Sequence, residues 1–168
     1  DYTKAIELDS DNSFTHRKRG LYYKNQSKEY NAALIDFTKA IELLPSDTEV
    51  RMDRGHLFQF FLDDPESALK DYESILKIDP SHIGAINNIG IIHESQGNTN
   101  LALQNYEKGI ALEETNPESA ANCYFNRARI HINQDKYDDA LSDISRAIEL
   151  DDDKTEFSSN SLLTLSPG

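Results

Sequence analysis

The chain has 168 residues, of which 30 are acidic and 17 basic, so its formal net charge is −13. This excess of acid argues against nucleic acid or an anionic membrane as the main partner, because both attract lysine and arginine. One cysteine cannot form an internal disulfide, no run approaches about 18 apolar residues, and no signal peptide is visible. We therefore expect a cytoplasmic protein with no membrane insertion and no nucleic-acid partner.

A short motif recurs along the chain at a nearly constant spacing. DYTKAIEL (1–8) returns as DFTKAIEL (36–43), and weaker copies follow at 71–78, 105–112 and 143–150. The fifth residues of the copies stand at positions 5, 40, 75, 109 and 147, so the intervals are 35, 35, 34 and 38. Upstream of four copies, a triplet closes with a small residue: Gly20, Gly55, Gly90 or Ala128. Spacing and residue types repeat together, which predicts a repeat architecture.

Two helices are predicted for each repeat. In residues 30–44 the apolar side chains are three or four residues apart, which places them on one face of a helix. The first helices are predicted at roughly 13–26, 48–62, 82–95 and 118–133. The predicted starts of first and second helices carry capping residues. Ser46 has capping-box spacing to Glu49, and Asp64 and Asn116 each precede a proline at the first helical position.

In chain order, the pattern divides the sequence into six segments. Residues 1–12 supply a second helix alone, residues 13–46, 47–81, 82–115 and 116–152 are repeats, and residues 153–168 form a flexible tail or linker. Four extra residues fall in the connector 113–120, which predicts either a first helix that starts one turn early or a longer loop. Because segment 1–12 lacks a first helix, we expect the sequence to be an excerpt of a longer array.

The repeated pattern has five elements in a fixed order, at a period near 34: a small residue, an alanine, an aromatic residue, a second alanine and a proline. This succession resembles the tetratricopeptide repeat (TPR), and the resemblance covers residues 1–152. It implies an all-α, right-handed superhelical solenoid of antiparallel helix pairs. It also implies that the first helices line a concave face used for protein–protein interaction. The small residues would permit close approach of the helices, and Phe37 and its counterparts would fill the space between them.

Patterns typical of catalysis or cofactor binding do not occur. The five histidines include no pair with metal-ligand spacing, Cys123 has no partner nearby in sequence, and there is no glycine-rich phosphate loop. By the same resemblance, chaperone-binding TPR domains hold acidic tails in a clamp of lysine, asparagine and arginine. The matching positions here are not adequately cationic, and Asp53 is among them. We therefore predict a non-catalytic chain without cofactor or metal that does not bind chaperone tails.

The predicted binding surface is the concave face of the first helices. Asparagine suits such a face because its amide can both donate to and accept from an extended peptide backbone. The candidate groove residues are Arg17, Lys18, Asp53, His56, Asn87, Asn88, Asn122, Asn126 and Arg129. We expect Asn88 and Asn126 to hold the backbone of a protein or peptide partner. The three basic candidates, Arg17, Lys18 and Arg129, would then pair with acidic side chains of the partner, and Asp53 would pair with a basic one.

Two other functions also fit the sequence. The chain could form homo-oligomers through the open half-repeat at 1–12 or through the leucines at 162–165. Alternatively, the repeats could be the substrate-recruiting arm of a larger enzyme such as a glycosyltransferase, because residues 87–98 are weakly similar to such arms. Both alternatives stay open at this point, as does the identity of the partner.

Overall fold

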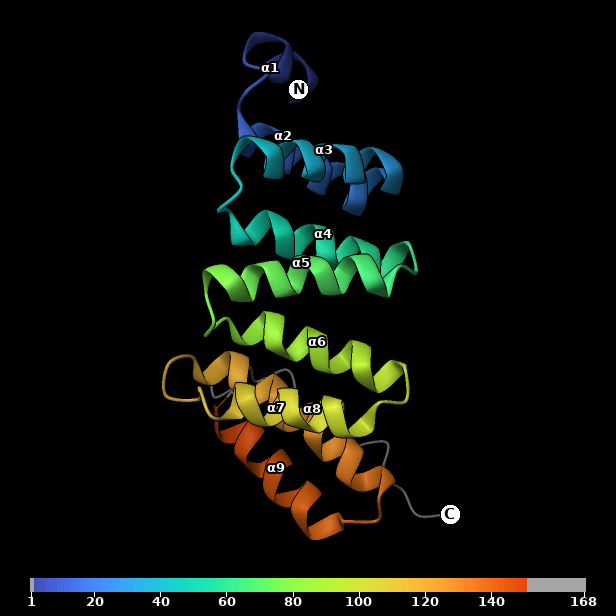
Figure 1. The fold of residues 1–168 in the computed structure, drawn as a ribbon, viewed down its shortest axis with the longest axis vertical. Coiled ribbons are helices and arrows are strands. Elements are labelled where there is room, and N and C mark those ends of the chain that lie inside the picture. Colours follow the sequence, from blue (N-terminus) through green and yellow to red (C-terminus); the bar gives the residue numbers. More distant parts are fainter. Residues whose placement is uncertain (1, 151–168) are drawn as a thin grey trace.

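The computed structural model describes residues 2–150, and within this range it contains helices and no strand (Figure 1). Its helices are α1 (Tyr2–Leu8), α2 (Ser13–Tyr22), the π-helical turn η1 (Tyr23–Ser27), α3 (Tyr30–Leu43), α4 (Thr48–Phe61), α5 (Pro65–Ile78), α6 (Ile83–Ser95), α7 (Thr99–Ile110), α8 (Pro117–Asn133) and α9 (Tyr137–Leu150). After α1 they pack as four pairs, α2 with α3, α4 with α5, α6 with α7 and α8 with α9. The pairs follow one another along one axis (Figure 1). The expected all-α solenoid of helix pairs is confirmed.

The starts of the first helices show where the extra residues of the last repeat go. Helices α2, α4 and α6 each begin seven residues before the small residue of their repeat (13 to 20, 48 to 55 and 83 to 90). Helix α8 begins at Pro117, which is eleven residues before Ala128. The four extra residues therefore form one additional turn at the start of α8. Of the two predicted alternatives, the helix that starts a turn early is correct.

Of the three predicted helix caps, two form in the structure, Asp64 on the second helix α5 and Asn116 on the first helix α8. Asp64 accepts a hydrogen bond from the backbone N–H three residues later at 3.0 Å, and Asn116 does the same at 2.9 Å. Helix α4 differs, because its cap is Asp47 and not Ser46. The Asp47 carboxylate accepts hydrogen bonds from the backbone N–H groups of Glu49 and Val50, at 3.0 and 3.2 Å. Its negative charge also suits the positive end of the helix dipole.

The ends of the first helices take up a difference in repeat length. The first two repeats have 13 residues from the small residue to the following alanine (20 to 33 and 55 to 68), whereas the last two have 12 (90 to 102 and 128 to 140). Every first helix is followed by a residue with positive φ: Lys28, Asp63, Gly97 or Asp135. The next backbone N–H donates to the carbonyl five residues back in the last two repeats, and six residues back in the first two. The wider turn absorbs the extra residue, so the second helices keep their register.

The core of each of the first three pairs is an aromatic ring packed on a glycine. Phe37, Tyr72 and Tyr106 have no exposed surface. A methyl group added to the facing glycine would lie 2.7 Å from Phe37 at Gly20, 2.6 Å from Tyr72 at Gly55 and 2.5 Å from Tyr106 at Gly90. Real side chains do not approach so closely, so these positions need glycine for the ring to fit. In the fourth pair both residues change together, to Ala128 and the smaller Ile144.

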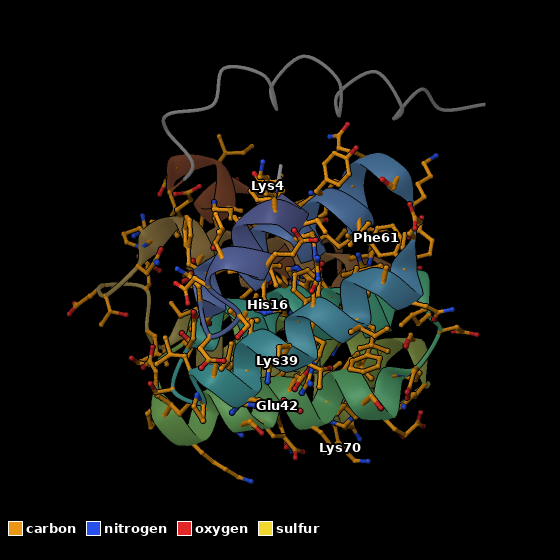
Figure 2. The ribbon with its side chains drawn as sticks, turned by 90° about the horizontal axis from the view of Figure 1, so that it is seen from above. Lys4, His16, Lys39, Glu42, Phe61 and Lys70 are labelled. Atoms are coloured by element: carbon orange, nitrogen blue, oxygen red, sulfur yellow. The ribbon has the colours of Figure 1, made fainter. Side chains whose placement is uncertain are left out.

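Two side-chain contacts can be located in a view along the stack. Figure 2 looks along the stack and shows Lys39 and Glu42 close together, where the Lys39 Nζ lies 3.7 Å from the Glu42 Oε2. Phe61 lies apart from them, and its ring centroid is 4.9 Å from that of Tyr30 (Figure 2). The predicted repeat boundaries at residues 46, 81 and 115 fall in the connectors between pairs. The predicted tail at 153–168 lies outside the described residues.

Candidate functional site

A pocket of about 400 Å³ opens to solvent between three successive first helices, α4, α6 and α8. Its lining residues are Met52, His56, His82, Gly84, Asn87, Asn88, Ser119 and Asn122. The structure thus brings together four of the nine predicted groove residues. The other four lining residues were not among the candidates: Met52 lies on α4, and His82, Gly84 and Ser119 lie at the starts of α6 and α8.

Asn88 and His56 join α6 to α4 in the wall of this pocket. The Asn88 Nδ2 lies 2.9 Å from the His56 Nε2 and 3.5 Å from the Met52 Sδ. Because an amide nitrogen can only donate, the His56 Nε2 accepts and the ring proton is on Nδ1. Burial and the nearby Lys24 lower the pKa of His56 below its ordinary value of 6.5, although Asp53 opposes them. His56 is therefore neutral at neutral pH, and the Nδ2 of Asn88 makes these two contacts, not its carbonyl oxygen.

His82 is oriented by its role as a helix cap. Its Nδ1 accepts a hydrogen bond from the backbone N–H of Ala85 at 3.2 Å at the start of α6. The proton of the neutral ring is therefore on Nε2. His82 thus adds a second N–H donor at the pocket, and the capping bond fixes the orientation of its ring.

Asn126 joins two first helices and does not line the pocket. Its Nδ2 donates to the Asn87 Oδ1 at 2.8 Å, and the two residues are only 7% and 8% exposed. This bond fastens α8 to α6 and leaves the amide nitrogen of Asn87 uncommitted. The Asn122 Nδ2 donates to the backbone carbonyl of Glu118 at 3.4 Å, which leaves its own carbonyl oxygen uncommitted.

Three of the four charged candidates form ion pairs within the chain, and the fourth, Lys18, contacts an aromatic ring. Arg17 Nε donates to the Asp53 Oδ2 at 2.7 Å, between α2 and α4. Arg129 makes two hydrogen bonds to the Glu94 carboxylate, at 3.1 and 2.7 Å, between α8 and α6, and these bonds raise the pKa of Arg129. The Lys18 Nζ lies 5.0 Å from the centroid of an aromatic ring on its own helix. Acid–base contacts that we expected with a partner are thus already made between neighbouring repeats.

A second set of repeated residues, which we did not predict, joins the two helices of a pair. In three pairs the arginine just before the small residue makes two hydrogen bonds to the aspartate just before the position of the aromatic ring. These pairs are Arg19 with Asp36 (2.7 and 2.8 Å), Arg54 with Asp71 (2.8 and 2.7 Å) and Arg127 with Asp143 (2.9 and 2.6 Å). The aspartates are at most 5% exposed. These ion pairs are therefore part of the packing and are not exposed recognition groups.

The remaining repeat shows that the arginine and the aspartate change together. Its corresponding residues are Ile89 and Asn105, so neither charge is present. A lone arginine or aspartate buried in this place would lack its partner, at a substantial cost in stability. The joint change was visible in the sequence. The middle letter of the triplets KRG, DRG, NIG and NRA is arginine in every repeat except the third, and the motif copies that begin at 36, 71, 105 and 143 start with aspartate in every repeat except the third.

The described residues offer little for covalent or metal chemistry. Cys123 has no exposed surface, and burial raises the pKa of its thiol to about 12, so the nucleophilic thiolate is scarce at neutral pH. Within residues 2–150 no group of three histidine, cysteine, aspartate or glutamate side chains is placed to hold a metal ion. No helix in the same range is long and apolar enough to cross a bilayer.

Comparison with known protein families identifies two repeats. Residues 83–116 and residues 121–154 each match a family model described as tetratricopeptide repeat. The first match covers α6 and α7, and the second begins in α8 and includes α9. A search of curated proteins finds no match.

Several solved structures have the same fold. MamA superposes with a TM-score of 0.73 at 21% identity, over 90% of this chain and 85% of that chain. MamA 41-end from Desulfovibrio magneticus RS-1 gives a TM-score of 0.71 at 16% identity, over 95% and 84%. YrrB, described as a TPR protein with an unusual peptide-binding site, gives a TM-score of 0.64 at 22% identity, over 90% and 75%. At these identities the likeness establishes the fold alone. Together with the two matched repeats, it identifies the chain as a tetratricopeptide repeat protein.

Proposed function

We propose that this protein binds an extended segment, or a helix, of a partner protein in a groove formed by α4, α6 and α8. TPR folds of this kind are in general scaffolds for protein–protein interaction. Stacked repeats present a continuous surface that no single repeat could provide. YrrB, which has the same fold, is described as having a peptide-binding site, and this supports the choice of a peptide as the ligand.

The observation that carries the proposal is the pocket itself. It is open to solvent, it receives residues from three repeats, and four of them were predicted to bind a peptide. Three of these four, Asn87, Asn88 and Asn122, keep one polar group of their amide uncommitted. Side chains in this state can bind a ligand without first breaking a bond within the protein.

The test is a pair of asparagine substitutions in the groove. A library of unbiased peptides on an array would supply ligands, and their affinities would be measured by fluorescence anisotropy. We expect Asn88→Ala together with Asn122→Ala to weaken binding about tenfold or more, because each removes a hydrogen-bonding group from the ligand. Asn126 is left intact because it holds α8 to α6. Because Asn88 also bonds to His56 on α4, circular dichroism would verify that the double variant keeps its fold.

The matched control is Gln104→Ala, which removes an exposed amide side chain from the second helix α7. This variant should bind the selected peptides as the parent protein does. The proposal fails if no peptide of the library binds, or if the control lowers the affinity as much as the double variant does.

Self-association is a second candidate function, and the last helix favours it. On α9, Leu141 and Ile148 are 63% and 64% exposed. Their counterparts on α3 are Leu34, which packs against the core, and Ile41, which is 8% exposed. Among the described residues, the face of α9 that corresponds to the buried face of α3 is therefore exposed, and exposed apolar faces of this kind often form contacts between molecules.

Light scattering at several protein concentrations separates this function from peptide binding. If the α9 face mediates assembly, the parent protein should form a dimer or larger species that dissociates on dilution. Leu141→Ser together with Ile148→Ser should then give a monomer, while the Asn88→Ala and Asn122→Ala pair should leave the assembly unchanged. A monomer at all concentrations would exclude self-association. The role of recruiting arm of a larger enzyme stays a prediction.

A further inference from the structure

The pocket between α4, α6 and α8 offers hydrogen-bonding groups of both kinds. Its uncommitted donors are the Nδ1–H of His56, the Nε2–H of His82 and the amide nitrogen of Asn87. Its uncommitted acceptors are the carbonyl oxygens of Asn88 and Asn122. The other lining residues are Met52, Gly84 and Ser119, so no lining side chain carries a permanent charge.

This combination discriminates between the side chains of a bound peptide. An ammonium or guanidinium group has donors only, so it would face the imidazole and amide N–H groups without an acceptor for them. A carboxylate has acceptors only, and it would face the carbonyl oxygens of two asparagines. A hydrocarbon side chain would exclude water from all of these groups and leave them unpaired. A carboxamide has a donor and an acceptor on one small planar group, so it can satisfy both kinds at once.

The charges around the pocket do not change this preference. Arg17 on α2 and Asp53 on α4 are 2.7 Å apart and neutralise each other, and the positive charge of Lys24 near His56 disfavours a cationic side chain of the ligand. Arg129 and Glu94, on α8 and α6, do the same. The chain as a whole carries a net charge of −13, which further disfavours an acidic ligand side chain.

We propose that this pocket takes the carboxamide side chain of a glutamine or asparagine of the partner polypeptide. The proposal rests on the groove function stated above and names the residue type that the groove selects. Room for the side chain exists in the pocket, which has a volume of about 400 Å³ and is lined in part by Gly84. A Cβ added at Gly84 would lie 3.4 Å from the His82 Cε1 and 3.6 Å from the Met52 Cε, which are ordinary contacts. A longer side chain at position 84 would extend into the space that the ligand uses.

Substitution arrays of the peptides that bind test this selection. Each position of a bound peptide is replaced by all twenty amino acids, and the affinity of each product is measured. For the parent protein we expect one position at which glutamine or asparagine binds about tenfold more tightly than glutamate, lysine or leucine, because the charged and apolar residues leave polar groups unpaired. Gly84→Leu should abolish this preference, whereas the control Gly84→Ala should keep it.

The outcomes separate this inference from the groove function. If peptides bind but no position prefers a carboxamide, or if Gly84→Leu keeps the preference, the inference is wrong and the groove function stands. If no peptide binds at all, both are wrong. Circular dichroism would show whether Gly84→Leu folds, and Asn122→Ala provides a second variant, since it removes one acceptor without adding bulk and should also reduce the preference for a carboxamide.

Discussion

Removing the charge of Arg54 is expected to destabilise the fold strongly. This arginine makes two hydrogen bonds to Asp71, at 2.8 and 2.7 Å, and a third to Thr38 at 3.1 Å. In the third repeat, the two corresponding positions hold Ile89 and Asn105. The substitutions Arg54→Ile and Asp71→Asn therefore transplant an arrangement that this fold already contains.

The burial of the pair sets the size of the effect. The side chain of Asp71 is 4% exposed and that of Arg54 is 19% exposed. Breaking a fully buried ion pair by removing one partner costs about 3–5 kcal/mol, and the partial exposure of the arginine reduces this to about 2–4 kcal/mol for Arg54→Ile. The double variant leaves no unpaired charge, so it should be more stable than Arg54→Ile by about 1–2 kcal/mol.

The assay is urea unfolding followed by far-ultraviolet circular dichroism, applied to the parent, both single variants and the double variant. Lys39→Ala is the control, because it removes an exposed ion pair with Glu42 whose side chains are 44% and 63% exposed. Its effect should be below about 1 kcal/mol. If the free-energy changes of the two single variants simply add in the double variant, Arg54 and Asp71 are not coupled and the reasoning is refuted.

Three further predictions concern the core, the pH dependence of stability and the thiol. Gly55→Ala places a methyl group 2.6 Å from the fully buried ring of Tyr72. Although alanine favours helices, thermal unfolding should show that the free energy of unfolding falls by about 1–3 kcal/mol. An unchanged stability would contradict the packing. Because the folded-state pKa of His56 is lowered, its contribution to stability is complete above the unfolded value of 6.5 and is lost as the pH falls through the lower folded value. The stability of His56→Gln should accordingly fall less between neutral and mildly acidic pH, and equal slopes would contradict the assignment. The thiol of Cys123, with its pKa raised to about 12, should react with a thiol-specific chromogenic reagent only after denaturation, and rapid reaction of the folded protein would contradict its burial.

The helical pairs were predictable because their signal is local and repeats. The apolar spacing within 30–44 and the recurrence of a glycine opposite an aromatic ring both depend on contacts inside one repeat. The cap of α4 was assigned one residue too early, since Ser46 and Asp47 are both good caps and their spacing alone does not rank them. The wider turns that end α2 and α4 also had a sequence signal, the one extra residue in each of those repeats.

The candidate site was predictable only in part, because its contacts join repeats. The face of each first helix follows from the sequence, but the neighbour that each side chain meets depends on how successive helices cross. Asn88 and Asn126 hold equivalent positions, two before the small residue, yet Asn88 lines the pocket and Asn126 bonds to Asn87. Arg17 and Asp53 are 36 residues apart, and no local pattern predicts that they pair.

The central claim is that a partner polypeptide lies against α4, α6 and α8. Nuclear magnetic resonance of the labelled protein, with a selected peptide at saturating concentration, tests it most directly. The account predicts that the largest shifts occur at His56, Asn88 and Asn122, including the side-chain amide signals of the two asparagines. Shifts confined to the exposed face of α9, at Leu141 and Ile148, with none in the pocket, would contradict it.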